Sequence, residues 1–186
     1  LLPTKERILA AVFQAVTPRT AGFNTEDLSG MTDASKSIMI LLMLIGGSPG
    51  STAGGMKTTT FMILLLNAVS TFRSKEDVSV FGRRIDGHVI KNAATIAMMY
   101  FTLFFCGGII LSIQNDIPLL DSLFEAASAV GTVGLTLGIT PELHIASRYV
   151  LIILMYLGRV GCLTLIYAGF SRKRQGNAKL PLEKIT

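Results

Sequence analysis

The sequence predicts an all-α integral membrane protein made of repeated helical units, with one membrane-spanning helix broken in its middle. Three observations predict this fold. Half of the residues are hydrophobic and only 16% are charged, well below the roughly 25% usual for a soluble domain. Several stretches almost without charge are long enough to cross a bilayer. Two short glycine-containing loops recur at one spacing along the chain.

The net charge of +5 does not indicate a nucleic-acid partner, because that requires basic residues gathered on one folded face. Here the basic residues lie in short stretches between apolar runs. This pattern favours membrane lipid as the neighbour, with basic segments facing anionic headgroups on the cytoplasmic side.

The two cysteines, Cys106 and Cys162, each lie in an apolar run without a motif around them. Neither a disulfide framework nor a zinc site is therefore predicted. We expect both to be small, buried packing residues.

We expect no signal peptide at the beginning of the chain, because the first apolar stretch, Ile8 to Val16, is only nine residues long and no methionine precedes it. We therefore expect a fragment, or the later part of a longer polypeptide. A missing N-terminal half would then complete the same structure.

Two stretches predict simple spans. Asn92 to Ile113 contains no charged residue, and at 1.5 Å per residue it can cross a hydrocarbon core of roughly 30 Å. Tyr149 to Phe170 is equally long and carries one charge, Arg159, near its midpoint. We expect the second stretch to span as well, although an intramembrane arginine is costly.

The stretch Ser37 to Thr71 has Lys57 as its only charge and is too long for one simple span. Residues 46–55 within it include five glycines and a proline, a run that does not hold a helix. We predict helical halves before Gly46 and after Lys57. Irregular backbone at membrane depth is tolerated only where it is buried in protein or lines a watery cavity, so the break points to a permeation pathway.

The distribution of basic residues orients the spans. Residues 114–147 contain no lysine or arginine, whereas both flanking segments are basic. The positive-inside rule therefore puts residues 73–91 and 171–186 in the cytoplasm and residues 114–147 outside. The basic residues concerned are Arg73, Lys75, Arg83, Arg84, Lys91, Arg172, Lys173, Arg174, Lys179 and Lys184.

The outer connection has the form of a re-entrant pore loop. Leu119 to Ser128 is apolar but too short to span, and Gly131-Thr-Val-Gly-Leu-Thr136 follows it. Lys5 to Val16, followed by Thr20-Ala-Gly-Phe-Asn-Thr25, repeats the form. Both loops are expected on the outer side.

A shift of 112 residues superimposes these two loops, and eight of 27 positions from Thr20 to Gly46 are then identical. With one residue inserted, Phe13-Gln-Ala15 also matches Phe124-Glu-Ala126. The two halves are therefore predicted to be structural repeats. The identical pairs are Thr20/Thr132, Gly22/Gly134, Ala34/Ala146, Ser35/Ser147, Ile40/Ile152, Leu42/Leu154, Met43/Met155 and Gly46/Gly158.

The loops have the residues of a potassium filter, which replaces the ion's hydration shell with backbone carbonyl oxygens. Glycine permits the positive φ that such a backbone needs. Thr-Val-Gly-Leu-Thr is a degenerate form of the potassium-channel loop Thr-Val-Gly-Tyr-Gly, and Thr-Ala-Gly-Phe-Asn is more degenerate. The expected filter residues are Thr20, Ala21, Gly22, Phe23, Asn24, Thr132, Val133, Gly134, Leu135 and Thr136.

Two charged residues belong to this predicted pore. The short helices aim their carbonyl ends at the pore centre, and Glu125 either adds negative charge there or supports the filter backbone by a hydrogen bond. The repeat register puts Gly47 opposite Arg159, so we expect the break and the arginine at similar depth, just inside the loops. Arg159 either forms a structural contact, with Glu125 or with carbonyls of residues 46–57, or opposes a passing cation.

The motif order resembles the Trk/Ktr/HKT superfamily of potassium transporters, specifically the ion-translocating membrane subunit. The motifs are Thr-Ala-Gly-Phe-Asn-Thr, Gly-Gly-Ser-Pro-Gly-Ser-Thr-Ala-Gly-Gly-Met-Lys-Thr, Phe-Glu-Ala-Ala-Ser-Ala-Val-Gly-Thr-Val-Gly-Leu-Thr and Gly-Arg-Val-Gly. Lys75-Glu-Asp-Val, Gly82-Arg-Arg-Ile and the basic tail look most like the Ktr type. The resemblance covers nearly the whole chain.

The resemblance implies a potassium uptake subunit of the cell membrane, not an enzyme, with four potassium-channel-type units around one pore. It also implies a homodimer of such polypeptides and a cytoplasmic nucleotide-binding regulatory subunit. On this reading residues 1–72 are the third unit without its first span, and 73–91 are a cytoplasmic connection. Residues 92–170 are the fourth unit and 171–186 the basic tail, so the chain cannot close the pore alone.

The resemblance also implies residue roles. Gly22 and Gly134 become filter glycines, potassium being held by backbone carbonyls, and residues 46–57 with Arg159 become the gate. The gate residues are Gly46, Gly47, Ser48, Pro49, Gly50, Ser51, Thr52, Ala53, Gly54, Gly55, Lys57 and Arg159.

Two other functions are weighed against a transporter. Gly50 to Thr58 nearly fits a phosphate-binding loop, but that loop must join a strand to a helix in a soluble α/β domain. Here the motif interrupts an apolar run without alternating strands around it, so an NTP-hydrolysing enzyme is not expected. A non-transporting helical bundle or receptor fragment is the remaining alternative, and loss of cation flux in loop variants would exclude it. The sequence leaves open the preference for potassium over sodium, the coupling to sodium or protons, and the regulatory nucleotide.

Overall fold

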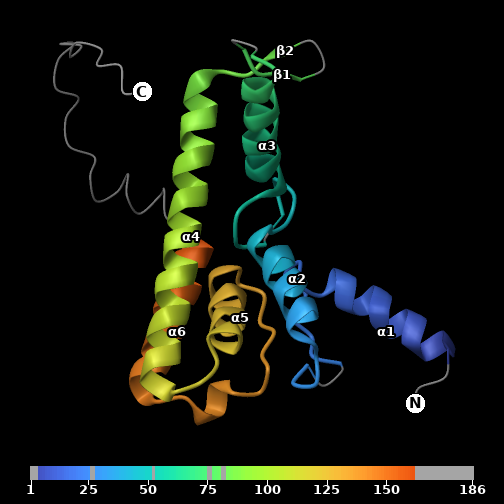
Figure 1. Cartoon of the computed structure of the whole chain (residues 1–186), viewed down its shortest axis with the longest axis vertical. Helices are drawn as coiled ribbons and strands as arrows, with labels where there is room; N and C mark the ends of the chain where they lie inside the picture. The colour runs from blue at the N-terminus through green and yellow to red at the C-terminus, as the bar shows by residue number, and fades with distance from the viewer. Residues whose placement is uncertain (1–3, 26–27, 52, 75–76, 81–82, 162–186) are drawn as a thin grey trace.

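The computed structural model describes residues 4–25, 28–51, 53–74, 77–80 and 83–161. These residues are largely helical, and a small antiparallel hairpin, which the sequence did not predict, lies at one end (Figure 1). The elements are α1 (Thr4–Val16), α2 (Asp33–Leu44), α3 (Thr58–Phe72), β1 (Ser79–Val80), β2 (Arg83–Arg84), α4 (Gly87–Asn115), α5 (Leu119–Val130), the 3-10 turn η1 (Thr140–Glu142) and α6 (Ile145–Val160).

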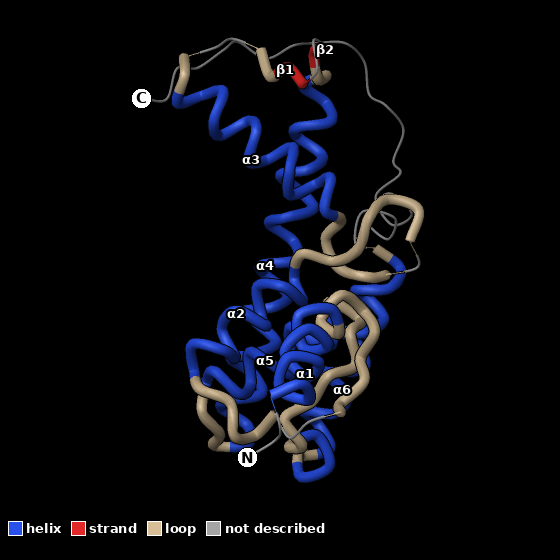
Figure 2. The backbone as a smooth tube through the Cα atoms, turned by 90° about the vertical axis from the view of Figure 1, so that its right-hand side faces the viewer, coloured by secondary structure: helices blue, strands red, loops and turns tan. Residues whose placement is uncertain are grey.

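The long helix α4 runs along the other helices from the hairpin to the opposite end of the molecule (Figures 1 and 2). The Asp86 side chain caps it by accepting a hydrogen bond from the His88 N–H (3.1 Å). Asp116, in the left-handed conformation with φ 52°, ends it. Of the described helices, α4 alone is long and apolar enough to cross a membrane by length and composition. It contains the predicted span Asn92–Ile113.

The short helix α5 lies in the interior, packed against α2, α4 and α6. Nearly all of its last three turns are buried, including Phe124 and Val130. Two glycines of α4 permit close packing here: a Cβ on Gly107 would meet the Leu154 side chain, and one on Gly108 the Leu123 side chain. The position of α5 is therefore fixed on three sides by other helices.

Helices α2 and α3 are separated by residues 45–57. Ile45 and Met56 form a short parallel bridge. The Gly46 N–H donates to the Met56 carbonyl at 2.8 Å, and the Thr58 N–H donates to the Gly47 carbonyl at 3.2 Å. These contacts close the base of the loop, so that α3 starts close to the point where α2 ends (Figure 1).

Part of the second predicted span lies outside the described residues. Helix α6 covers the first half of Tyr149–Phe170, and the description ends at Gly161. Cys162, the predicted tail 171–186, and Thr52 of the predicted gate also lie outside the described residues.

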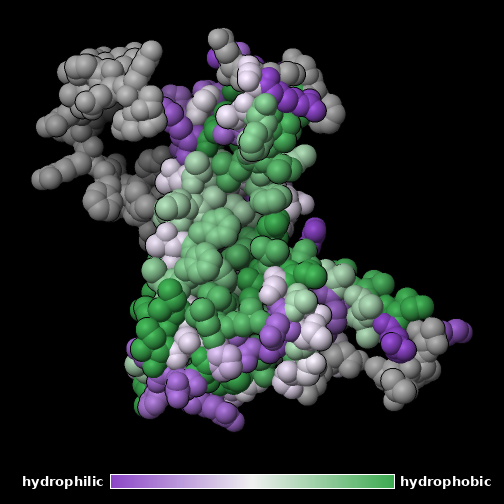
Figure 3. All heavy atoms as spheres, in the orientation of Figure 1, coloured by the Kyte–Doolittle hydropathy of each residue, from purple (hydrophilic) through white to green (hydrophobic). Residues whose placement is uncertain are grey.

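The outer surface of the described helices is strongly apolar. Green residues cover most of the visible face in Figure 3, and polar residues gather near the hairpin and at the opposite end. Cys106 is exposed on α4, so the expectation that it is buried is wrong. Cys106 lies, with Phe105 and Ile109, on the side of α4 that the described helices leave uncovered.

Helix α1 projects away from the other helices (Figure 1). Its apolar side chains are largely exposed: Leu9 is 69% and Val12 58% exposed. It differs in this from α5, the matching helix of the second repeat, which is enclosed. The two short helices thus occupy matching positions in the repeat, but α1 is largely exposed and α5 is buried.

Candidate functional site

The two glycine loops, residues 20–24 and 132–136, lie side by side. The side-chain amide of Asn24 donates to the carbonyl of Thr136 at 2.8 Å, and these two residues are 112 positions apart, the repeat spacing. A Cβ on Gly22 would come closer than 3.0 Å to the Val133 carbonyl oxygen. Matching positions of the two repeats therefore meet in space.

The two loops share an uncommon backbone conformation. Thr20 and Thr132 have φ of 71° and 51°, and Gly22 and Gly134 have φ of 69° and 93°. A left-handed threonine is strained, and such strain persists only where the surroundings impose it, often at functional sites. Left-handed residues at every second position can turn successive carbonyls toward one side. In a regular strand, by contrast, successive carbonyls point to opposite sides.

Each loop follows directly from a short helix. The Gly22 N–H donates to the Thr17 carbonyl at 3.3 Å, just past the end of α1. The Val133 N–H donates to the Ser128 carbonyl, in the last turn of α5, at 2.9 Å. Gly131 is not among the predicted filter residues, although it opens the Gly-Thr-Val-Gly run. A Cβ there would lie 2.7 Å from the Met43 carbonyl oxygen of α2.

Glu125 supports the second loop. Its carboxylate is buried, and its Oε1 accepts hydrogen bonds from the Leu137 N–H (2.9 Å) and the Thr136 hydroxyl (2.7 Å). Its Oε2 accepts one from the Thr140 hydroxyl (2.9 Å). Of the two roles weighed for Glu125, hydrogen bonding to the loop backbone is the one that this geometry fits.

The first loop is supported by a different residue: the Thr17 hydroxyl accepts a hydrogen bond from the Phe23 N–H and donates one to the Phe23 carbonyl, each at 3.3 Å. Gln14 occupies the position that matches Glu125, and its side-chain nitrogen and oxygen are buried without a hydrogen-bond partner. The Thr20 hydroxyl oxygen is in the same condition. The hydrogen bond from Asn24 to Thr136 links the first loop to the second across the repeat boundary. The sequence alone did not indicate this bond.

The glycine-rich loop, residues 46–57, touches the second glycine loop. The Gly54 N–H donates to the Thr132 hydroxyl oxygen at 3.0 Å, and a Cβ on Gly54 would collide with the Thr132 side chain. Lys57 donates from its ammonium group to the carbonyls of Ser51 (3.1 Å) and Ala53 (2.5 Å). Lys57 therefore stabilises the glycine-rich loop from within by two hydrogen bonds.

Arg159 lies in the last turn of α6 and is exposed. It borders a cavity of about 370 Å³ next to the second glycine loop. The other lining residues are Ser128, Thr132, Val133, Gly134 and Met155. Thr132 thus lines the same cavity as Arg159 and also accepts the hydrogen bond from the glycine-rich loop.

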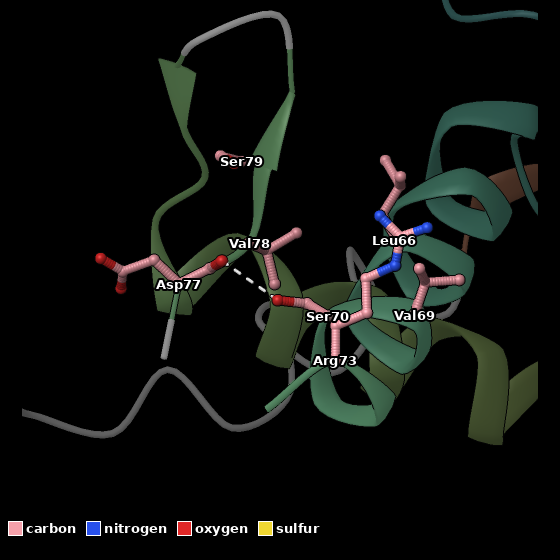
Figure 4. A pocket seen from close by; sticks show the side chains of 7 residues that line it. All are labelled: Leu66, Val69, Ser70, Arg73, Asp77, Val78 and Ser79. Carbon is pink, nitrogen blue, oxygen red and sulfur yellow. Dashed lines mark hydrogen bonds between the residues drawn. The ribbon is translucent and has the colours of Figure 1, made fainter. Parts of the chain in front are cut away.

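A smaller cavity of about 110 Å³ lies between the end of α3 and the hairpin (Figure 4). The Ser70 hydroxyl donates to the Asp77 carbonyl there at 3.1 Å. None of the residues lining this cavity belongs to the glycine loops. Within the described part of the chain, no group of three or more His, Cys, Asp or Glu side chains could hold a metal ion.

The described residues form a largely helical fold in which one helix could cross a membrane by its length and composition. The chain belongs to the TrkH family, because the family model described as a cation transport protein matches residues 1–177. The family predicted from the motif order is thereby confirmed, and it is a family of transporters, not of enzymes.

Known relatives agree with this assignment. The chain is 39% identical over 176 residues to the Ktr system potassium uptake protein B of Bacillus subtilis strain 168, covering 95% of this chain and 39% of that protein. It is 39% identical over 186 residues to the potassium/sodium uptake protein NtpJ of Enterococcus hirae, covering 97% of this chain and 41% of that protein. The chain thus spans about two fifths of the length of these relatives.

A solved structure shares the fold. The potassium transporter TrkH from Vibrio parahaemolyticus superimposes with a TM-score of 0.76 over 90% of this chain and 38% of that chain, at 23% identity. This likeness shows the fold of the described helices and carries no residue roles.

Proposed function

We propose that the chain supplies two adjacent units of a potassium uptake pore, in which the two glycine loops line a filter with backbone carbonyls. The observation that carries the proposal is the pair of loops in contact, with left-handed residues at matching positions (Thr20/Thr132 and Gly22/Gly134). A potassium ion is held by carbonyl oxygens that replace its hydration shell. The names of the relatives, potassium and potassium/sodium uptake proteins, support this ion class.

The short helices α1 and α5 act as pore helices in this proposal. The carbonyl end of a helix carries a partial negative charge, and both helices end at a glycine loop. Glu125 then holds the outer end of the second filter loop through Leu137 and Thr136. A rigid filter follows, in which an ion meets carbonyls at fixed positions.

The glycine-rich loop and Arg159 form the gate of the proposed pore. The loop contacts Thr132 through Gly54, and residues 48–51 at its tip are exposed. A loop with few packing contacts opens at low cost in free energy. Arg159 borders the cavity beside Thr132 and Gly134, where its charge would oppose a passing cation.

The wider assembly is also proposed. Residues 1–72 and 92–170 would be the third and fourth units of the pore, with α2 and α3 the two parts of one broken span. Residues 73–91 and 171–186 would be cytoplasmic and the glycine loops outside, by the positive-inside rule. The remaining units, a second copy of the polypeptide and a cytoplasmic nucleotide-binding subunit would complete the transporter, as the resemblance to Ktr systems implies.

Substitution of Gly134 tests the filter. Serine at a residue with φ of 93° strains the backbone and disturbs the carbonyls around it. Gly134→Ser in the complete transporter should lower the preference for potassium over sodium in uptake competition at equal membrane expression. Gly138→Ser is the matched control, because Gly138 has a similar φ of 88° but open space around it and no place in the filter. An unchanged preference in Gly134→Ser would refute the assignment.

A further inference from the structure

A partly buried ion pair joins the two repeats away from the glycine loops. The Lys36 ammonium nitrogen lies 2.6 Å from Asp121 Oδ1, and the two side chains are only 10% and 23% exposed. Lys36 lies in the first turns of α2 and Asp121 in the first turn of α5. Because removing one member of a partly buried pair leaves a poorly solvated charge without its partner, this contact favours one arrangement of α2 against α5.

The pair lies at a point that affects both glycine loops. Asp121 is one helical turn before Glu125 on α5, and Glu125 holds the backbone of Leu137 beyond the second loop. Helix α2 follows the first loop, and its Met43 carbonyl borders Gly131 at the start of the second. A shift of α5 along α2 would therefore move the second loop relative to the first.

The matching basic residue of the second repeat behaves differently. Arg148 follows Ala-Ser as Lys36 does, but it donates to the carbonyls of Leu143 (3.0 Å) and Pro141 (2.5 Å) within its own repeat. A basic residue at this position does not by itself require a partner across the boundary. The Lys36–Asp121 contact is therefore a specific feature of the boundary between these two units.

We propose that Lys36 and Asp121 are a positioning pair that fixes the relative placement of the two glycine loops and so contributes to ion preference. The inference rests on the proposed function of those loops as a filter. The pair touches no ion itself. It acts through α5 and Glu125 on the carbonyls of the second loop, and its effect is on discrimination between ions of different size.

The test measures potassium-over-sodium preference in the complete transporter at equal membrane expression. Lys36→Met and Asp121→Asn should each lower the preference by about tenfold, since a misplacement of about 1 Å in a preorganised site costs up to about a hundredfold. Lys36→Arg and the reversed pair, Lys36→Asp with Asp121→Lys, should recover most of the loss because each restores opposite charges across the boundary. Arg84→Met is the control, because the Arg84–Asp77 pair is exposed (74% and 47%) and should leave the preference unchanged.

The outcomes separate this inference from the proposed function when Gly134→Ser is measured in parallel. If Gly134→Ser lowers the preference and the Lys36 and Asp121 variants do not, the positioning role is overturned and the filter assignment stands. If Gly134→Ser also has no effect, both are overturned. Equal losses in the single variants and the reversed pair would likewise overturn the positioning role. If Lys36→Met does not reach the membrane, the reversed pair decides.

Discussion

Replacing Glu125 tests how the second glycine loop is held. The informative variants are Glu125→Leu, which removes both acceptor oxygens, and Glu125→Gln, which keeps one. Gln14→Leu is the matched control, because Gln14 stands at the same place in the first repeat and its amide has no hydrogen-bond partner. A polar side chain of the same length is thus replaced by leucine once where three donors depend on it and once where none does.

The magnitude follows from the three donors. In Glu125→Leu the hydroxyls of Thr136 and Thr140, which are 3.0 Å apart, can still bond to each other. The Leu137 N–H, at a residue only 8% exposed, loses its acceptor, and an unsatisfied buried donor costs about 1–3 kcal/mol. Glu125→Gln leaves an acceptor for that N–H and loses mainly the charge assistance, or about 1 kcal/mol.

The assay is competition of sodium against potassium uptake, together with the thermal midpoint of the purified transporter. We expect Glu125→Leu to lower the potassium preference by roughly tenfold, equal to about 1.4 kcal/mol, and to lower the midpoint. Glu125→Gln should have a smaller effect and Gln14→Leu almost none. If Gln14→Leu and Glu125→Leu were equally damaging, or equally harmless, the reasoning from hydrogen-bond support would be wrong.

Two predictions concern the proposed gate. Arg159→Gln should raise maximal potassium uptake. A charge about 8 Å from the ion, at an effective dielectric near 20, raises the energy of the passing ion by roughly 2 kcal/mol, which is about a thirtyfold effect on uptake. Arg159→Lys keeps the charge and should keep much of this barrier. Uptake in Arg159→Gln at or below that of Arg159→Lys, with both proteins folded, would exclude the electrostatic role. Deleting residues 48–51 should raise ion flux measured without the regulatory subunit, because the loop then loses its exposed tip and blocks less of the pathway. Flux that stays low and regulated would make the loop structural.

Local patterns in the sequence predicted where α2, α3 and α4 lie. Glycine and proline in residues 46–55 disfavour a helix on local grounds alone, and α2 and α3 end and begin on either side of them. The uncharged stretch Asn92–Ile113 likewise predicted α4. The hairpin of β1 and β2 was missed, because two-residue strands carry too little alternation to be recognised.

The sequence suggested which residues belong to the candidate site, but it indicated few of their contacts. The repeat spacing indicated that Gly22 and Gly134 correspond, and the structure brings their loops together. No local sequence pattern predicted that Asn24 would hydrogen-bond to Thr136. Nor did any pattern predict that Glu125 would accept a hydrogen bond from the Leu137 N–H, whereas the side-chain amide of Gln14 has no hydrogen-bond partner. The sequence pattern treats Gln14 and Glu125 as equivalent, whereas their surroundings differ.

The sequence by itself determined the family, the helical membrane fold and the internal repeat, because each depends on composition, on the length of apolar runs, or on motifs that lie close together along the chain. Only the tertiary structure decided which groups meet across the repeats. The Lys36–Asp121 pair and the Asn24–Thr136 bond join residues 85 and 112 positions apart. Such contacts depend on how α2 and α5 pack, and packing is set by the three-dimensional fit of whole helices, which no local pattern encodes.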